Sequence, residues 1–282
     1  MLKRLKANNT DNHVNDLEKG SVLLFDDLSF PLLESEKFLL NATYADPKAK
    51  NIYYVGRQDK LGGFQQLTTE QQLILKRMLQ RFVDFSTKLI VKTLPYYQEN
   101  LLLGRTSFRP LQISNRKTSY RKDDKRLHVD AFPSSPNQGK RILRVFANVN
   151  PHGEARVWRL GEPFEKVAQR FLPQIKAPLF GFASLLKSLR ITKSLRTAYD
   201  HYMLHMHDTM KGDEHYQKHA DQQEVHFAPE TTWIVQTDHV SHAAMSGQYL
   251  LEQTFYLQVE HMQNPEYSPL RVLEEMVGKR LV

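Results

Sequence analysis

The sequence contains no cysteine among its 282 residues. Disulfide bonds, thiolate metal ligands and cysteine nucleophiles are therefore excluded, and a metal site would have to use histidine and carboxylate groups. A long apolar run is also missing, because Lys187 interrupts the most apolar stretch, residues 178–189, and a membrane-spanning helix needs roughly 18 apolar residues. Residues 7–13, which follow a basic start, are polar where a signal peptide would be apolar. We therefore expect a cytoplasmic protein.

Acidic residues are fewer than basic ones, 31 against 39, which gives a net charge of +8. This excess predicts an anionic partner, such as nucleic acid, a phosphorylated substrate or a membrane surface. Two classes of function remain open: an enzyme, or a basic protein that binds nucleic acid or an anionic membrane without catalysis. The sequence carries no helix-turn-helix, zinc-finger or aromatic-basic sheet signature, so nucleic acid is not the expected partner.

The hydrophobic pattern predicts one domain over residues 21–282, preceded by a flexible tail at residues 1–20. Helical periodicity covers about 68–103 and 163–220. Short segments rich in Val, Ile and Phe, separated by Pro, Gly and Asn, indicate a β core at about 105–151 and 231–260. The composition is typical of an α+β or mainly β fold with flanking helices.

Residues 141–150 form the clearest predicted strand. Because side chains alternate across a strand, Arg144, Phe146 and Asn148 share one face. This mixture of polar and apolar groups is typical of the lining of a solvated pocket.

His128 and Asp130 are the first candidates for a metal site. On an extended segment, residues i and i+2 point to the same face, so an imidazole and a carboxylate can bind one ion. His242, in the predicted turn between two strands, is placed to supply a third ligand, with His239 as a near competitor. Two histidines and one carboxylate leave open positions on Fe(II), as oxygenases require.

Other histidine patterns are weaker. His219 and Asp221 repeat the His-X-Asp spacing, but they follow a helical segment on which i and i+2 diverge. His201 and His205 have the i, i+4 spacing of zinc sites, yet no Glu follows His201, so the metalloprotease motif is absent.

Four longer blocks of sequence are far more specific than the His-X-Asp spacing. They are HVDAFPSSP at 128–136, RVFANVNP at 144–151, TDHVSHAA at 237–244 and GQYLLEQTF at 247–255. In these blocks the chain resembles the Kdo hydroxylases, Fe(II)/2-oxoglutarate dioxygenases that act on the 3-deoxy-manno-octulosonate (Kdo) sugar of lipopolysaccharide. The resemblance runs from about residue 17 to the C-terminal helix. It implies a double-stranded β-helix, or jelly-roll, core with flanking helices.

The resemblance also implies roles for individual residues. The iron ligands would be His128, Asp130 and His242, which would be the catalytic centre, and 2-oxoglutarate would be bound by Arg144, with Arg109 and Asn148 nearby. Many 2-oxoglutarate enzymes carry an arginine about ten residues after the distal histidine, whereas this chain has LEQT at 251–254. The cosubstrate carboxylate must then be held from another strand, which favours Arg144.

The implied reaction uses Fe(II), 2-oxoglutarate and dioxygen, hydroxylates C3 of Kdo in a lipid A precursor, and releases succinate and carbon dioxide. The implied location is the cytoplasmic face of the inner membrane, as a peripheral protein. Two basic segments bear on this location: residues 116–126, and residues 166–199 with an apolar stripe at Phe182, Leu185, Leu186 and Leu189. Each segment fits either contact with an anionic lipid or an ordinary solvated surface.

Overall fold

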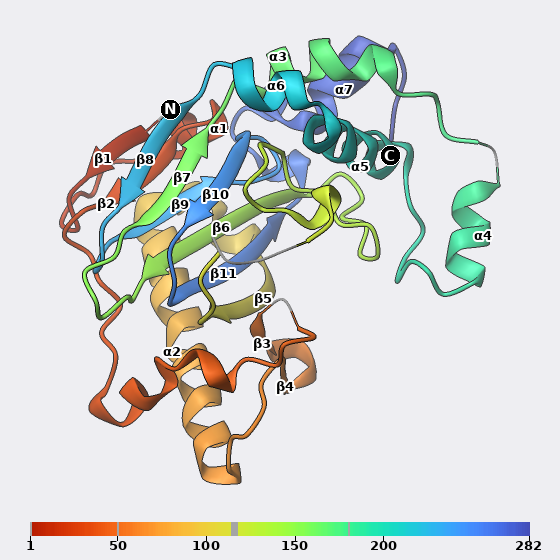
Figure 1. Cartoon of the computed structure of the whole chain (residues 1–282). Coiled ribbons are helices and arrows are strands. Elements are labelled where there is room, and N and C mark those ends of the chain that lie inside the picture. The colour runs from red at the N-terminus through yellow and green to blue at the C-terminus, as the bar shows by residue number, and fades with distance from the viewer. Residues whose placement is uncertain (1, 50, 114–117, 180) are drawn as a thin grey trace.

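The computed structural model describes residues 2–49, 51–113, 118–179 and 181–282. Two β-sheets form its centre (Figure 1). The larger sheet contains, in spatial order, β1 (Leu2–Leu5), β2 (Val22–Phe25), β9 (Thr232–Gln236), β6 (Arg141–Asn148), β11 (Leu250–Leu257), β5 (Leu102–Arg109), β3 (Ile52–Val55) and β4 (Lys60–Gly62). The smaller sheet contains β10 (His242–Ser246), β7 (Arg156–Leu160) and β8 (Gln223–Phe227). All pairings are antiparallel except β1 with β2.

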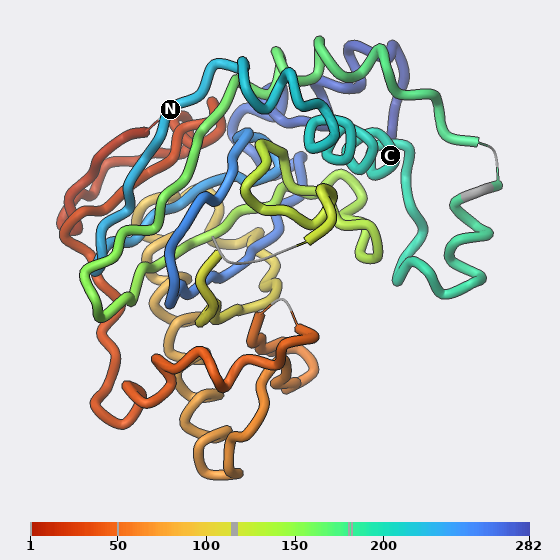
Figure 2. Tube along the Cα trace, viewed as in Figure 1, coloured from red at the N-terminus to blue at the C-terminus, as the bar shows by residue number. Residues whose placement is uncertain are grey.

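Helices lie above, behind and to the right of the sheets in the view of Figures 1 and 2. They are α1 (Val14–Glu18), α2 (Thr69–Thr93), α3 (Phe164–Phe171), α4 (Phe182–Ser188), α5 (Ala198–Gly212), α6 (Glu214–His219) and α7 (Pro269–Val277). Short 3₁₀ helices occur at Glu34–Leu39, Ala42–Tyr44, Gly56–Gln58, Pro95–Asn100, Tyr120–Lys122, Leu172–Gln174, Val259–His261 and Pro265–Tyr267. None of the helices in the described ranges is long and apolar enough to cross a membrane.

An aromatic cluster joins the two sheets face to face. Phe146 on β6 lies 5.1 Å from Trp158 on β7, measured between ring centroids, and Trp233 on β9 stacks on Phe227 of β8 at 4.0 Å. These residues belong to a core that is separate from the helix-facing one. Two facing sheets with strands crossing between them form the expected jelly-roll core.

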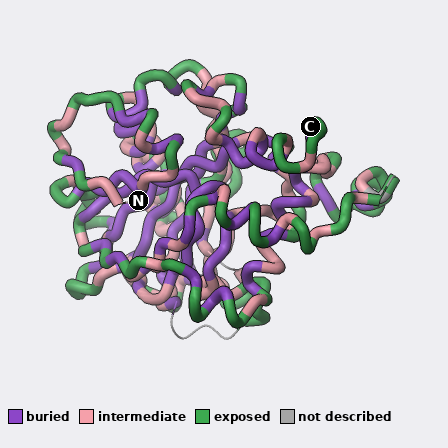
Figure 3. Tube along the Cα trace, turned by 90° about the horizontal axis from the view of Figure 1, so that it is seen from above, coloured by how far each residue is buried: buried purple, intermediate pink, exposed green. Residues whose placement is uncertain are grey.

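Helix α2 covers the outer face of the larger sheet. Thr68 caps it by accepting a hydrogen bond from the backbone N–H of Gln71, and the helix ends before Pro95. Its buried side chains share one core with Leu143, Val145 and Ala147 of β6, while Phe146 points into the other core. The predicted alternation along this strand is therefore present, and it separates a helix-facing side from an interior side. Figure 3 shows that the buried residues are concentrated in the central strands.

The prediction of a flexible tail at residues 1–20 is wrong. Strand β1 pairs with β2 from Leu2 opposite Val22 to Leu5 opposite Phe25, and α1 buries Leu17. The buried carboxylate of Glu18 accepts hydrogen bonds from the hydroxyl of Tyr97 and from two backbone N–H groups near residue 263. Polar side chains of this segment, such as those of Arg4 and Glu18, have partners elsewhere in the fold, and composition alone does not reveal this.

The helical prediction for 163–220 corresponds to four helices, α3 to α6, rather than to one long basic helix. Helix α4 stands apart from the body of the molecule (Figure 1). Residues 176–179 and 181–197 around it, called here the basic arm, contain five lysine or arginine residues and no acidic residue. In the basic segment 116–126, Arg116 and Lys117 lie outside the described residues, and in the basic segment 166–199 the side chain of Phe182 does.

Candidate active site

A cavity of about 1500 Å³ opens between the two sheets at one end of the jelly roll. Side chains from β5, β6 and β11 of the larger sheet form one wall, and residues of β7 and β10 form the opposite wall. The loop of residues 128–135, the hairpin of β3 and β4, and the side of α5 complete the lining. Every residue discussed below as part of the site faces this space.

His128 and His242 are brought together by their backbones. They form an isolated antiparallel bridge in which each N–H donates to the carbonyl of the other, at 3.0 and 2.9 Å. The N–H of Asp130 donates to the carbonyl of Thr237 at 2.8 Å, which continues this pairing. As a result, one ligand atom from each of His128, Asp130 and His242 lies within 4.8 Å of the others. Within the described ranges this is the only such group of three or more histidine and carboxylate side chains.

Both imidazole rings are oriented by backbone carbonyls. Nδ1 of His128 lies 2.7 Å from the carbonyl oxygen of Arg126, and Nδ1 of His242 lies 2.8 Å from that of Val240. Because a carbonyl only accepts, each Nδ1 carries the proton and each Nε2 keeps its lone pair. Trp158 stacks on the His242 ring at 5.1 Å and fixes its plane. This is the arrangement that holds histidine ligands ready for a metal ion.

The charges of the three groups also fit a divalent cation. Burial lowers the pKa of both His128 and His242, so both rings are neutral at pH 7. Burial alone would raise the pKa of Asp130, but the Arg144 guanidinium, the two histidines and a hydrogen bond with Thr237 together outweigh burial and hold that pKa below its usual range. Two neutral imidazoles and one carboxylate are the protonation states that metal binding requires.

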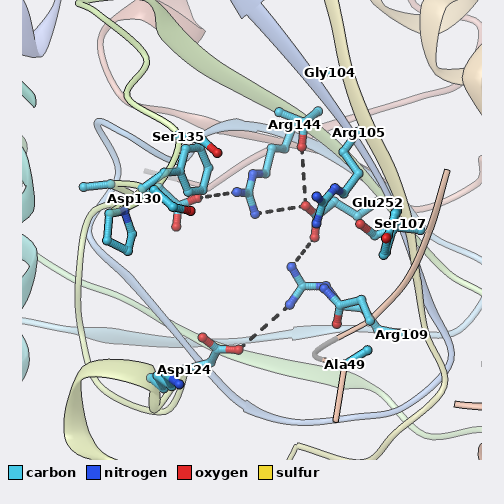
Figure 4. Close-up of a pocket in the computed structure, with 18 of the residues that line it drawn as sticks. Ala49, Gly104, Arg105, Ser107, Arg109, Asp124, Asp130, Ser135, Arg144 and Glu252 are labelled. Carbon is cyan, nitrogen blue, oxygen red and sulfur yellow. Dashed lines mark hydrogen bonds and ion pairs between the residues drawn. The ribbon is translucent and has the colours of Figure 1, made fainter. Parts of the chain in front are cut away.

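Four further charged groups extend from Asp130 across the cavity wall (Figure 4). The guanidinium of Arg144 lies 3.0 Å from Oδ2 of Asp130 and 3.0 Å from Oε1 of Glu252. The other oxygen of Glu252 accepts a hydrogen bond from Arg109, whose Nη1 is 4.0 Å from Asp124. The structure therefore brings both predicted arginines to the cavity. A sequence reading based on single residues missed Glu252, which connects them.

Asn148 is not brought to the cavity. Its amide donates to the carbonyls of Glu154 and Phe227, at 3.1 and 3.0 Å, and its Oδ1 accepts from the N–H of Asn150. The strand rises about 3.3 Å per residue, so Asn148 lies about 13 Å along β6 from Arg144. It shares the predicted face, but it lies too deep to reach the lining.

The competing histidines lie elsewhere. His239 is buried against Phe164 and 3.9 Å from the carboxylate of Glu165, and it does not line the cavity. His219 is exposed on α6, and the rings of His201 and His205 lie next to each other, tilted by 51°, on the surface of α5. By contrast His207 of α5, which no motif singled out, lies 5.2 Å from the His128 ring and lines the cavity.

The cavity lining is strongly basic. Among the described residues that form it, ten are lysine or arginine and four are aspartate or glutamate. Arg57, Lys60 and Arg105, on the side of β3, β4 and β5, have no acidic partner within the described ranges. The space is therefore suited to a substrate with negative charges.

A jelly roll that carries a His-X-Asp pair beside a distal histidine at the mouth of its interior defines a class, the non-heme Fe(II)/2-oxoglutarate-dependent dioxygenases. Comparison with protein families gives the narrower assignment. The family model for 3-deoxy-D-manno-oct-2-ulosonic acid (Kdo) hydroxylase matches residues 2–280. The chain belongs to the Kdo hydroxylase family, and the resemblance seen in the sequence is confirmed.

Solved structures agree with this assignment. The Kdo hydroxylase KdoO, a non-heme Fe(II) alphaketoglutarate dependent dioxygenase in complex with cobalt(II), is similar with a TM-score of 0.96 and 45% identity, over 100% of this chain and 97% of that one. KdoO in complex with alphaketoglutarate and Fe(III) matches with a TM-score of 0.95 and 44% identity over the same shares of the chains. The comparison with curated proteins found no match. The predicted fold, enzyme class and cofactors are thereby confirmed.

Proposed function

We propose that this protein hydroxylates C3 of the Kdo sugar in a Kdo-containing lipid A precursor, with Fe(II), 2-oxoglutarate and dioxygen, and with release of succinate and carbon dioxide. The observation that carries the proposal is the convergence of His128, Asp130 and His242 at the base of a basic cavity, in a chain of the Kdo hydroxylase family.

The three converging side chains are the proposed iron ligands. Nε2 of each imidazole and one oxygen of Asp130 would hold Fe(II), since both Nδ1 atoms are engaged by carbonyls. When bound, Fe(II) with 2-oxoglutarate and dioxygen supplies the oxidising chemistry that replaces a C–H bond by C–OH. The protein contributes neutral imidazoles, an ionised carboxylate and a shielded cavity.

Arg144 is the proposed partner of the far carboxylate of 2-oxoglutarate, with Arg109 beside it. Arg144 is almost completely buried, at 8% exposure, and its planar guanidinium can donate two parallel hydrogen bonds to a carboxylate. Its contact with Asp130 supports a cosubstrate site directly beside the proposed metal site. The deep position of Asn148 supports no cosubstrate role for that residue.

The sugar is proposed to enter from the basic side of the cavity. Kdo carries a carboxylate and lipid A precursors carry phosphates, and these charges complement Arg57, Lys60 and Arg105, which have no acidic partner among the described residues. The Arg105 guanidinium lies over the Tyr53 ring at 4.5 Å, which holds the side chain at the edge of the cavity. Binding of an anion at this edge would leave the sugar to extend toward His128.

The basic arm is proposed to contact the anionic surface of the membrane that carries the substrate, on its cytoplasmic face. Lys187, Arg190 and Lys193 are exposed on the arm. The same arm carries exposed apolar side chains, namely Leu179 at 76%, Leu185 at 52%, Leu189 at 61%, Ile191 at 52% and Leu195 at 42%. This combination is typical of interfacial segments. The backbone N–H of Lys193 donates to the carbonyl of Ser134, which joins the arm to the loop that carries Asp130.

The test of the function is 2-oxoglutarate turnover by the full chain with Fe(II), with and without Kdo-lipid A. Succinate release that rises with the lipid, together with a product heavier by one oxygen atom, is the expected result. Absence of any 2-oxoglutarate turnover, combined with salt-sensitive binding to nucleic acid or to anionic vesicles, would favour the non-catalytic alternative instead.

A further inference from the structure

Glu252 lies between the two arginines of the cavity wall because of the strand register. On β11, Glu252 is opposite Phe146 of β6 and Ser107 of β5. Arg144 is opposite Thr254, two residues farther along β11, and Arg109 is opposite Leu250, two residues earlier. Since residues two apart on a strand point to the same face, all three charged side chains project into the cavity, and Glu252 is the diagonal neighbour of both arginines.

Each carboxylate oxygen of Glu252 contacts a different arginine. Oε1 lies 3.0 Å from Arg144, and Oε2 accepts a hydrogen bond from Arg109. Glu252 is 4% exposed, so these contacts are shielded from solvent and only weakly screened. The two guanidinium groups would otherwise repel each other across the width of a single strand.

Without this carboxylate the two arginines would have different remaining partners. Arg144 would keep Asp130, at 3.0 Å, and would be drawn toward the proposed metal ligand. Arg109 would keep only Asp124, at 4.0 Å on the opposite side of the guanidinium. Both movements separate the two cations (Figure 4).

We infer that Glu252 is a positioning residue that holds the guanidinium groups of Arg144 and Arg109 side by side as one anion-binding pair for the distal carboxylate of 2-oxoglutarate. The inference rests on the proposed function. Glu252 itself does not touch the cosubstrate, because like charges would repel. Its role is to set the distance between two cations that come from strands on either side of it.

The test compares Glu252→Gln and Glu252→Asp with the wild-type chain. The Gln variant removes the charge, and the Asp variant keeps the charge but shortens its reach. We expect the KM for 2-oxoglutarate to rise about 10- to 100-fold in the Gln variant, as is usual when a group that orients a ligand-binding residue is lost, and to rise less in the Asp variant. The kcat at saturating 2-oxoglutarate should stay within a few-fold of wild type.

A second measurement does not depend on turnover. Calorimetric binding of 2-oxoglutarate to the Co(II)-loaded chain should weaken by the same factor in Glu252→Gln, while the affinity for Co(II) itself stays unchanged. Glu36→Gln is the matched control, because Glu36 is 2% exposed and pairs with Arg81 at 2.6 Å, away from the cavity. It should lower stability without altering 2-oxoglutarate binding.

The outcomes separate the inference from the function on which it rests. If the wild-type chain neither binds nor consumes 2-oxoglutarate, the proposed function fails. If wild type does both and a folded Glu252→Gln has an unchanged KM and affinity, the inference is overturned and the function stands. If Glu252→Gln does not fold, Glu252→Asp decides: a raised KM with unchanged Co(II) affinity supports the positioning role, and wild-type values overturn it.

Discussion

Arg144 and Asp130 are joined at 3.0 Å, between Nη2 of the guanidinium and Oδ2 of the carboxylate. The other oxygen of the same carboxylate lies 3.7 Å from Nε2 of His128. A single carboxylate therefore faces the proposed metal on one side and the proposed cosubstrate arginine on the other. Because the two sites share this carboxylate, binding of the metal and binding of 2-oxoglutarate should influence each other electrostatically.

Arg144→Lys should raise the KM for 2-oxoglutarate roughly tenfold or more, because lysine keeps the charge but loses the planar pair of donors. Metal affinity should be preserved, since a cation still neutralises Asp130. Steady-state kinetics measures the KM, and Co(II) titration of the same preparation measures the metal affinity. An unchanged KM would mean that Arg109 is the main partner of the 2-oxoglutarate carboxylate. Arg109→Lys should then be the variant with the raised KM.

Replacing His128, Asp130 or His242 by Ala should abolish hydroxylation and weaken metal binding strongly, because each change removes one of three ligands. His239→Ala is the control, because that ring is equally buried but lies against Phe164 and outside the cavity lining. Metal content and succinate release are the measurements. Activity that survives in His242→Ala but is lost in His239→Ala would show that the distal ligand is misassigned.

Much of the site could be predicted because its residues follow local rules. The i, i+2 spacing places His128 and Asp130 on one face of an extended segment, and the alternation along β6 places Arg144 on the interior side. The same alternation predicted the face of Asn148 correctly but not its depth. A period of two fixes which side of a sheet a residue faces, and it does not fix which layer of the interior it reaches.

Other features depend on pairings that no local pattern contains. Glu252 lies in the region where many 2-oxoglutarate enzymes carry an arginine. Its contacts become apparent only in the sheet, where it is flanked by β6 and β5, which lie more than 100 residues earlier in the chain. The fixed structure of residues 2–20 likewise depends on the parallel pairing of β1 with β2 and on partners of Glu18 near residue 263. In both cases the structure is determined by contacts between residues that are far apart in the sequence.

Asn148→Ala should destabilise the protein without affecting the cosubstrate. The change leaves the carbonyls of Glu154 and Phe227 without their donor, which costs about 1–3 kcal/mol for a buried site. Chemical denaturation measures the loss, and the KM for 2-oxoglutarate should stay at the wild-type value. A raised KM at unchanged stability would restore the cosubstrate role that the resemblance implied for this residue.

The metal-free protein should lose stability as the pH falls below about 6.5. The folded pKa of His128 and of His242 is lowered by burial, so below 6.5 the unfolded chain takes up protons that the folded chain does not. The free energy of unfolding should then fall by up to about 1.4 kcal/mol per pH unit for each histidine. The pKa of Asp130 is also lowered, but its stabilising effect is lost only below its ordinary value of 3.8.

Denaturation of the chelator-treated protein between pH 7.5 and 5.5 measures this dependence. A His128→Gln/His242→Gln double variant should have a shallower decline, because two of the titrating groups are gone. Equal slopes in the wild type and the double variant would mean that neither imidazole is kept neutral by the fold.

The basic arm should bind anionic vesicles in a salt-sensitive way. Each lysine or arginine near such a surface contributes about 1 kcal/mol, and the attraction is screened beyond a Debye length of roughly 8–10 Å. Changing Lys187, Arg190, Lys193 and Arg196 to Gln should therefore remove up to about 4 kcal/mol of binding. The exposed leucines of the arm would remain and retain a weaker, salt-insensitive component.

The matched control changes four exposed cations outside the arm, Arg77, Lys88, Lys279 and Arg280, to Gln, which lowers the net charge by the same amount. This variant should bind vesicles nearly as well as wild type, because the arm and its apolar side chains are intact. Turnover of 2-oxoglutarate without lipid should be the same in all three proteins, since Arg144 and the metal ligands are untouched. Co-sedimentation with vesicles at several salt concentrations gives the comparison. Equal loss of binding in both variants would mean that net charge, and not the arm, attracts the protein to the membrane.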